Sequence, residues 1–380
     1  MKNRLNLLMY LFSASVILSA VSCKTEKKAK FTPLDKSKFE STFNGKPVGL
    51  YNLENKNGLM VQITNYGARM VTLWVPDRDG NFADIITGYD TIADYFKDGN
   101  YFDGIVGRYA NRIAKGKFTL NGVEYTLPIN SAPNMLHGGI EGFDKKVWDV
   151  LKNTEDSLVL TYTSVDGEEG FPGNLTATVT YSLNDSNELR IDYQAVTDAP
   201  TVVNLTSHGF YNLAGYNDGD ILNHILMINA DKYTPVDSNF IPTGEIADVA
   251  GTPLDFRTPT AIGARIGDDN IQLKYGLGYD HNWVLNKKDS EMSLACRLEE
   301  PVSGRVMEIY TTEPGLQFYT GNFLDGSIIG KNGVAYKYRQ SVCLETQHFP
   351  DSPNHDNFPS TVLNPGEKYQ TSTFHKFLVK

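Results

Sequence analysis

A glutamate inside an apolar segment near the C-terminal end of the sequence is the first candidate for chemistry. The segment 341–348 alternates with a period of two, which places Glu345 on one face of a strand with Cys343 and Gln347. A carboxylate in such a strand must be paired, protonated or functional, because an unpaired buried charge is costly. Taken alone, a glutamate on an edge strand facing water is the more common explanation.

Two histidines are candidates for a second group. His208 lies in the segment 201–211, which we predict as one strand with Asn204 and Thr206 on the same face as the histidine. His137 precedes two glycines, which relieve crowding and allow a close approach. By itself, each histidine is more often a hydrogen-bonded structural residue or part of a turn that needs positive φ.

Several further polar side chains lie beside aromatic residues. A sugar site requires flat apolar faces for C–H groups, and amides or charged groups for hydroxyls. Metal ligation is poorly supported, because only His348 and His355, in a loop rich in Pro and Asn, lie at a close spacing. The candidates for holding a sugar are Asn111, Arg112, Asp280 and Gln317.

The composition indicates a globular protein with a large core. The chain has 380 residues and a net charge of −10, and it is 41% hydrophobic and 11% aromatic, which excludes wholesale disorder. No block rich in Lys and Arg follows the first 30 residues, so a nucleic-acid partner is not expected. No long exposed apolar stretch indicates an interface, and we therefore expect a monomer.

Alternation with a period of two continues after residue 40 and predicts antiparallel strands. The clearest case is a hairpin that joins 175–183 to 189–195 through a polar turn. Helical periodicity is nearly absent, apart from single turns at 91–96 and 261–266. The many short strands predict one all-β domain over 41–380, a large antiparallel β-sandwich. Further strands are predicted at 60–64, 70–75, 157–163, 225–229 and 305–311.

The first 22 residues form a different kind of sequence. Basic residues precede an uncharged apolar stretch over 5–20, which is typical of a secretory signal. The stretch ends in small residues before Cys23 and resembles a bacterial lipoprotein signal. That resemblance implies lipidation of Cys23 and anchoring to a bacterial membrane in the cell envelope, in the periplasm or at the outer membrane. Ordinary export with Cys23 unmodified is the alternative. Residues 23–40 are expected to form a flexible tether.

Two further cysteines, Cys296 and Cys343, remain if Cys23 carries lipid. They could pair in an oxidising compartment. Each lies in an apolar segment predicted as a strand, however, and is more simply explained as a small buried hydrophobic residue.

A series of motifs in chain order resembles the aldose 1-epimerase (galactose mutarotase) family, from about residue 45 to the C-terminus. In one motif the family usually has Asn before the histidine and Ser after it, where this chain has Ser207 and Gly209. Phe210 and Tyr211 then stand where the family has Tyr followed by Phe, while His208 itself is kept. These departures concern the neighbouring hydrogen bonds and the sugar preference rather than the reaction. The matching segments are 107–116, 136–139, 142–145, 169–173, 204–208, 233–237, 241–245, 255–257, 279–282, 313–322 and 344–351.

The resemblance implies a galactose-mutarotase-like supersandwich that interconverts the α and β anomers of free aldoses such as glucose and galactose, in hexose metabolism. The C1–O5 bond opens and closes again on the other face, so a base must take the proton of the C1 hydroxyl and an acid must protonate the ring oxygen. By resemblance Glu345 is the base and His208 the acid, and we expect an ionised glutamate and a protonated histidine. The sugar would be held by Asn111, Arg112, His137, Asp280 and Gln317.

No redox or electron-sink cofactor is needed for such a reaction. Some relatives carry a divalent ion, so binding of Ca²⁺ is an open alternative. The acidic stretch 166–169 is an unspecific candidate for such a site.

Two other functions share parts of this pattern. A sugar-binding module would keep the aromatics and amides but would need neither Glu345 nor His208. An epimerase for sugar phosphates or for a polysaccharide end would need a cluster of cations or an open cleft, and Arg112 alone is too little. We therefore expect small aldoses as partners, with the membrane reached only through the lipid anchor.

Overall fold

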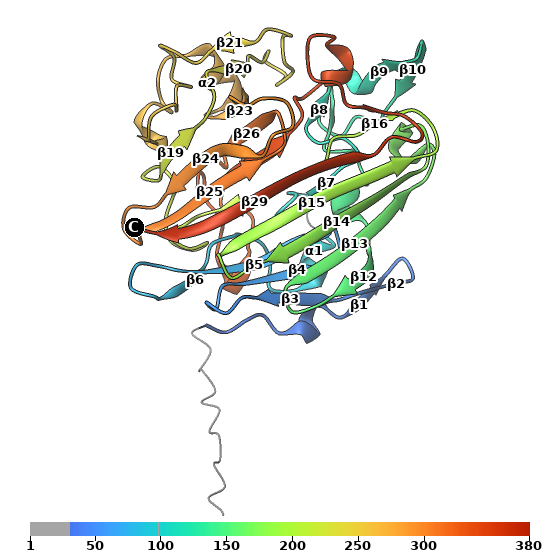
Figure 1. Cartoon of the computed structure of the whole chain (residues 1–380). Coiled ribbons are helices and arrows are strands. Elements are labelled where there is room, and N and C mark those ends of the chain that lie inside the picture. Colours follow the sequence, from blue (N-terminus) through green and yellow to red (C-terminus); the bar gives the residue numbers. More distant parts are fainter. Residues whose placement is uncertain (1–30, 98) are drawn as a thin grey trace, which may run out of the picture. The chain divides into compact units, whose positions relative to one another are not determined.

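The structure is a computed structural model that describes residues 31–97 and 99–380. The predicted signal segment 1–22 and Cys23 lie outside the described residues. The named strands pair antiparallel throughout, and three sheets of nine, six and four strands form most of the domain (Figure 1). Among the described residues, no helix combines the length and the apolar character needed to cross a membrane.

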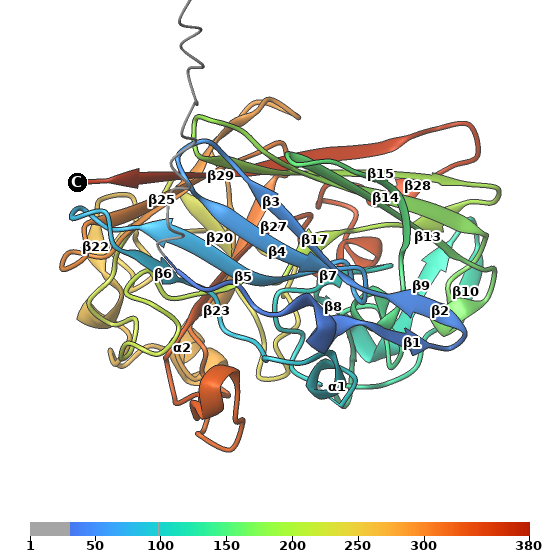
Figure 2. The ribbon, with the colours of Figure 1, turned by 90° about the horizontal axis from the view of Figure 1, so that it is seen from below.

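The nine-stranded sheet contains the two strands of the predicted hairpin as its third and fourth strands. Residues of β14 (Leu175–Leu183) are alternately buried and half-buried, so one face of this strand packs into the core, as its period of two predicted. Figure 2 shows the long strands of this sheet nearly edge-on. In spatial order the strands are β12 (Asp149–Asn153), β13 (Ser157–Ser164), β14 (Leu175–Leu183), β15 (Glu188–Thr197), β29 (Tyr369–Val379), β25 (Arg305–Thr311), β24 (Ser293–Glu299), β19 (Ile225–Ile228) and β22 (Thr260–Ala261).

The six-stranded sheet carries three of the predicted site residues, Asp280, Gln317 and Glu345. Its strand β27 (Val342–Gln347) pairs with a neighbour on each side, and all six of its residues are buried. Glu345 is only 2% exposed, so the explanation as an edge-strand residue in water is wrong. In order the strands are β18 (Phe210–Tyr211), β27 (Val342–Gln347), β26 (Gly315–Tyr319), β23 (Asp280–Val284), β20 (Lys232–Thr234) and β21 (Ala247–Asp248).

Strand β27 is buried on both faces for different reasons. Val342 and Leu344 belong to the main hydrophobic core, which also takes residues from the nine-stranded and four-stranded sheets. Cys343 belongs to a second core cluster, on the face that it shares with Glu345. One face of this strand therefore stabilises the fold while the other presents polar groups. The four-stranded sheet consists of β3 (Leu50–Glu54), β4 (Met60–Thr64), β5 (Arg69–Pro76) and β6 (Phe82–Asp84).

The segment 201–211 is not the single strand that we predicted. It forms three short strands, each of which pairs with a different part of the chain, so the backbone changes partner on both sides of His208. A Cβ atom at Gly209 would lie 2.5 Å from the Tyr211 ring, so the turn between the last two strands requires glycine there. The pairs are β16 (Thr201–Val202) with β28 (Val362–Leu363), β17 (Thr206–Ser207) with β7 (Ile105–Val106), and β18 with β27.

The domain begins earlier than the expected boundary at residue 41. Residues 36–39 form a short 3₁₀ helix in which Phe39 is fully buried, and the Phe31 ring stacks on Trp74 with 4.7 Å between centroids. The part of the expected tether that the structure describes therefore packs on the domain instead of extending from it.

The remaining elements are short. The single turns expected at 91–96 and 261–266 are present, as α1 (Ile92–Tyr95) and a 3₁₀ turn at Ile262–Ala264, whereas α2 (Ile271–Gly276) was not predicted. Cys296 and Cys343 are both buried and neither is in a disulfide, which confirms their interpretation as small core residues. Small strand pairs are β1 (Ser41–Phe43) with β2 (Lys46–Val48), β9 (Lys117–Leu120) with β10 (Val123–Thr126), and β8 (Arg112–Ile113) with β11 (Met135–Leu136).

Candidate active site

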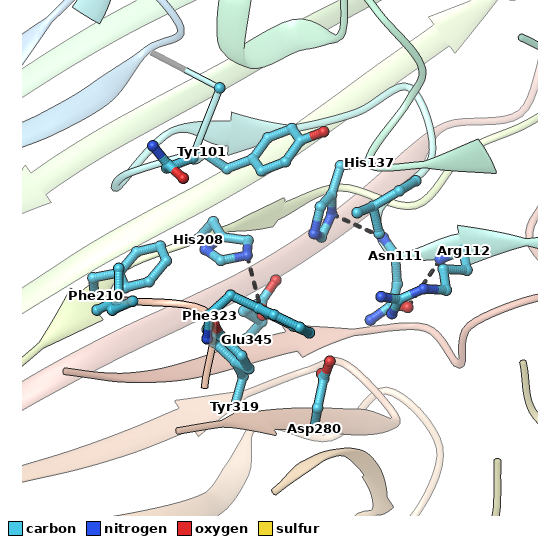
Figure 3. Close-up of a pocket in the computed structure, with 14 residues that line it drawn as sticks. Tyr101, Asn111, Arg112, His137, His208, Phe210, Asp280, Tyr319, Phe323 and Glu345 are labelled. Atoms are coloured by element: carbon cyan, nitrogen blue, oxygen red, sulfur yellow. Dashed lines mark hydrogen bonds and ion pairs between the residues drawn. The ribbon is translucent and has the colours of Figure 1, made fainter. Parts of the chain in front are cut away.

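A pocket of about 180 Å³ gathers polar side chains from distant parts of the chain (Figure 3). They come from the start of β8, the turn after β11, the break between β17 and β18, and strands β23 and β27. The pocket thus brings together six of the seven residues that were predicted to transfer protons or to hold the sugar. Those residues are Asn111, Arg112, His137, His208, Asp280 and Glu345.

Glu345 and His208 face each other in this pocket. Nε2 of His208 lies 3.7 Å from Oε1 of Glu345, and both side chains are buried. The histidine is held in the break between strands by its backbone: its N–H donates to Gly104 O at 2.9 Å, and its carbonyl accepts from Asp103 N–H at 3.0 Å. The side chain can therefore point into the pocket without belonging to a regular strand.

His137 and Asn111 are bound to each other through the backbone. His137 N–H donates to the carbonyl of Asn111 at 2.9 Å, and Asn111 N–H donates to Nδ1 of His137 at 3.2 Å. Because Nδ1 accepts a hydrogen bond, Nε2 carries the proton and can act as a donor. A Cβ atom at Gly138 would overlap the carbonyl of Gly107. The close approach expected at this glycine is therefore made by the chain's own backbone.

Arg112 supplies the pocket's cation. Its guanidinium lies over the ring of Phe240 at 4.5 Å, and its charge acts on both carboxylates, Asp280 and Glu345. Stacking on an aromatic face holds a guanidinium in place without neutralising it. One cation thus balances one of the two carboxylates.

Gln317 is not among the residues that line the pocket, and its role in holding the sugar stays a prediction. Its Nε2 donates to Oδ1 of Asp280 at 2.7 Å, and its Oε1 accepts from Gln347 at 3.4 Å. Both ends of the amide are thus used by the protein. Gln317 lies directly opposite Glu345 in the sheet register, so it is near the site but supports Asp280 from behind.

Aromatic residues that the sequence did not single out complete the lining. The Tyr101 ring centroid lies 4.7 Å from that of His137 and 6.0 Å from that of His208. Tyr319 lies two residues after Gln317 on β26, so the period of two was an available signal. Tyr101 lies in a loop with positive φ, where no periodicity could have indicated it. Phe323 also lines the pocket, and its side chain is 53% exposed.

Burial disfavours charge on both central groups. It raises the pKa of Glu345 well above its usual range, with the nearby Asp280 adding to the effect and Arg112 opposing it. It also lowers the pKa of His208 to about 4. Burial therefore opposes the arrangement that we expected, an ionised Glu345 beside a protonated His208.

The same side chains also have the composition of a metal site, since ligand atoms of His137, His208 and Glu345 lie within 4.8 Å of one another. A neutral His137 cannot ligate through Nε2, however, while its Nδ1 accepts the N–H of Asn111. The arrangement therefore suits proton transfer better than metal binding.

The acidic stretch 166–169 has protein partners in this structure. Glu168 forms a 2.9 Å ion pair with Lys146, and Glu169 accepts the backbone N–H groups of residues 140–141. These contacts account for the two carboxylates as turn-stabilising groups. Calcium binding here stays a prediction.

Comparisons with known proteins point to one family. The sequence model described as "Aldose 1-epimerase" matches residues 49–375. A galactose mutarotase from Mus musculus is 47% identical over 323 residues, which cover 84% of this chain and 92% of that protein. An aldose 1-epimerase from Escherichia coli (strain K12) is 38% identical over 339 residues, which cover 89% and 97%.

Solved structures show the same fold. An aldose epimerase homologue from C. elegans superimposes with a TM-score of 0.81 at 31% identity, covering 87% of this chain and 99% of that chain. A galactose 1-epimerase from Lactobacillus acidophilus NCFM gives a TM-score of 0.79 at 30% identity, with coverage of 89% and 97%. The expected supersandwich of antiparallel sheets is thereby confirmed.

Proposed function

The chain belongs to the aldose 1-epimerase family and is an isomerase that interconverts the anomers of aldoses; we propose that Glu345 and His208 carry its two proton transfers. The observation that supports this assignment is their 3.7 Å approach inside one buried pocket. The C1 hydroxyl oxygen and the ring oxygen of an aldose are bonded to the same carbon. A base and an acid that serve both must therefore lie close together.

Ring opening starts with the proton on the C1 hydroxyl. Glu345, as a carboxylate, takes this proton while Nε2 of His208 gives one to the ring oxygen, and the C1–O5 bond breaks. The aldehyde end then rotates about the C1–C2 bond. On closure the roles reverse: the other face of C1 is attacked, His208 takes back its proton, and Glu345 returns one to the new hydroxyl.

The charges of the pocket suit a pair that holds one exchangeable proton. The positive charge of Arg112 offsets the negative charge of Asp280. The pocket is therefore electrically neutral when Glu345 and His208 together hold one proton. Burial favours that proton on the carboxyl group, and protonated His208 forms when the proton crosses to Nε2. The two forms differ only in the position of one proton, so neither form changes the net charge of the site.

The other pocket residues hold the sugar in this proposal. Arg112 and the Nε2–H of His137 are donors, and Asp280, fixed by Gln317, accepts from hydroxyls. Tyr101, Tyr319 and Phe323 offer ring faces to the C–H groups of the sugar. The chemistry is proton transfer alone, and enzymes of this family need no cofactor for it.

Glucose and galactose are the substrates that we propose, since relatives are named for galactose. Polarimetry on freshly dissolved α-D-glucose and α-D-galactose, with and without EDTA, tests the proposal. We expect both sugars to reach anomeric equilibrium faster with the protein than in buffer, and EDTA to have no effect. Buffer-like rates for both sugars would contradict the proposed substrates.

We also propose that the protein is anchored in a bacterial cell envelope through lipid on Cys23. The uncharged stretch 5–20 and the small residues before Cys23 support this location. The family match begins at residue 49, so the anchor would lie outside the catalytic domain.

A further inference from the structure

His208 has a thiol against the ring nitrogen that faces away from Glu345. Sγ of Cys343 lies 3.6 Å from Nδ1 of His208, within the range of a sulfur hydrogen bond. Cys343 and Glu345 are two residues apart on β27, so one strand face presents a group to each nitrogen of the same imidazole. The contact is fully buried.

Among the described side chains around His208, the sulfur of Cys343 is the group within hydrogen-bond range of Nδ1. Its own carbonyl already accepts the N–H of Asp103, whose carboxylate in turn accepts the N–H of Phe210 at 3.0 Å. The carboxylate of Asp103 is thus directed at the backbone beyond the histidine. The groups that face the ring from neighbouring elements are Tyr101, His137, Phe210, Cys343 and Glu345.

The proposed reaction makes a specific demand on the two ring nitrogens. Nε2 gives up and regains the exchanged proton, so Nδ1 must keep its hydrogen in both states. A buried N–H needs an acceptor. A carboxylate at this position would stabilise the imidazolium and weaken His208 as an acid, whereas a neutral thiol accepts only weakly. Burial and the charge of Glu345 raise the pKa of Cys343 well above its usual range, which keeps the thiol neutral.

We propose that Cys343 is a positioning residue whose sulfur accepts the Nδ1–H of His208, so that Nε2 is the nitrogen that exchanges its proton with the sugar. This inference rests on the proposed role of His208. The sulfur fixes the tautomer and the ring orientation, and it leaves the imidazolium acidic enough to protonate a ring oxygen.

The test combines spectroscopy with two substitutions. In the ¹⁵N-histidine NMR spectrum of the wild type at neutral pH, we expect the His208 signals, assigned by their loss in His208→Asn, to show hydrogen on Nδ1. Cys343→Ser supplies a hydroxyl, a stronger acceptor that stabilises the imidazolium. The acidic limb of its kcat/KM profile should therefore move to higher pH than in the wild type. Cys343→Ala removes the acceptor and should lower kcat roughly five- to tenfold with little change in KM, the size of one lost hydrogen bond.

A purely structural role would give a different pattern. Both substitutions would then lower the thermal midpoint without moving the acidic limb, and that result overturns the inference. A wild-type spectrum with hydrogen on Nε2 alone also overturns it. If Cys343→Ala fails to fold, the serine variant and the spectrum still decide. A fully active His208→Asn would instead contradict the proposed function, so the two failures are distinguishable.

Discussion

The backbone N–H of Asn111 donates to Nδ1 of His137, and the N–H of His137 donates back to the carbonyl of Asn111. Both residues have positive φ, 62° and 51° respectively, so two strained positions support each other. This reciprocal pair fixes one tautomer of His137 and directs a donor at the sugar.

His137→Asn should therefore raise KM more than it lowers kcat. Asparagine tolerates positive φ, so the backbone pair can persist, while its shorter amide loses the donor position of Nε2–H. We expect a roughly three- to tenfold higher KM, measured by polarimetric initial rates. His137→Ala is the harsher control, because alanine does not favour positive φ and should also lower the thermal midpoint. An unchanged KM in the asparagine variant would contradict the donor role.

Glu345→Gln should abolish most turnover and leave sugar binding largely intact. The amide keeps the shape of the side chain but cannot take the proton of the C1 hydroxyl, so kcat should fall by at least roughly 10²-fold. Glu313→Gln is a matched control, because Glu313 is equally buried but pairs with His348 outside the pocket. It should cost stability and leave kcat near the wild-type value. Near-native turnover in Glu345→Gln would exclude this residue as the base.

The double variant Glu345→Gln with His208→Asn should lose little more activity than either single variant. Base and acid serve one transition state, so their effects are not additive. Single-turnover rates for the four proteins complete the cycle. Losses that multiply would mean that the two groups act in separate steps.

Gln317→Leu should act through Asp280, because Gln317 hydrogen-bonds to that carboxylate and is not among the residues that line the pocket. Removing the 2.7 Å hydrogen bond withdraws a group that holds down the pKa of Asp280, which burial already raises. We expect a higher KM whose increase is not additive with that of Asp280→Asn in a double-mutant cycle. If the increases in KM of the two single variants multiply in the double variant, Gln317 contacts the sugar directly, as the sequence indicated.

The kcat/KM of the wild type should be bell-shaped in pH. The active pair holds one proton: at low pH His208 gains a second one, and at high pH the pair loses its only one. Because burial lowers the pKa of His208 to about 4 and raises that of Glu345, activity should persist well below neutral pH. An acidic limb near pH 6.5, the ordinary range of histidine, would contradict the effect of burial.

Mass spectrometry of the native N-terminus tests the proposed anchor. We expect a chain that begins at Cys23 and carries lipid, and Cys23→Ser should release the protein from the membrane fraction. An intact Met1, or cleavage at another site, would exclude a lipid anchor on Cys23.

Much of the fold could be predicted because burial imposes a period of two on sheet strands. The strands at 60–64 and 305–311 begin and end where alternation placed them. The same rule failed at 201–211, because alternation describes residues and not the partner strands, and three partners divide this segment.

The site was predictable mainly where a motif surrounds the residue. The motifs indicated Glu345 and His208, which both line the pocket, but they could not show that Gln317 hydrogen-bonds to Asp280. The pKa direction of Glu345 was also missed, because it depends on desolvation by segments that are remote in sequence.

The early start of the domain limits how far the folded part can lie from Cys23. Phe31 already packs on Trp74, so only residues 24–30 separate Cys23 from the folded part. Seven residues span at most roughly 25 Å even when fully extended. If Cys23 carries lipid, the enzyme cannot sample the whole depth of the surrounding compartment. It would then act in a thin layer beside the bilayer, where a sugar is met as it arrives at or leaves the membrane.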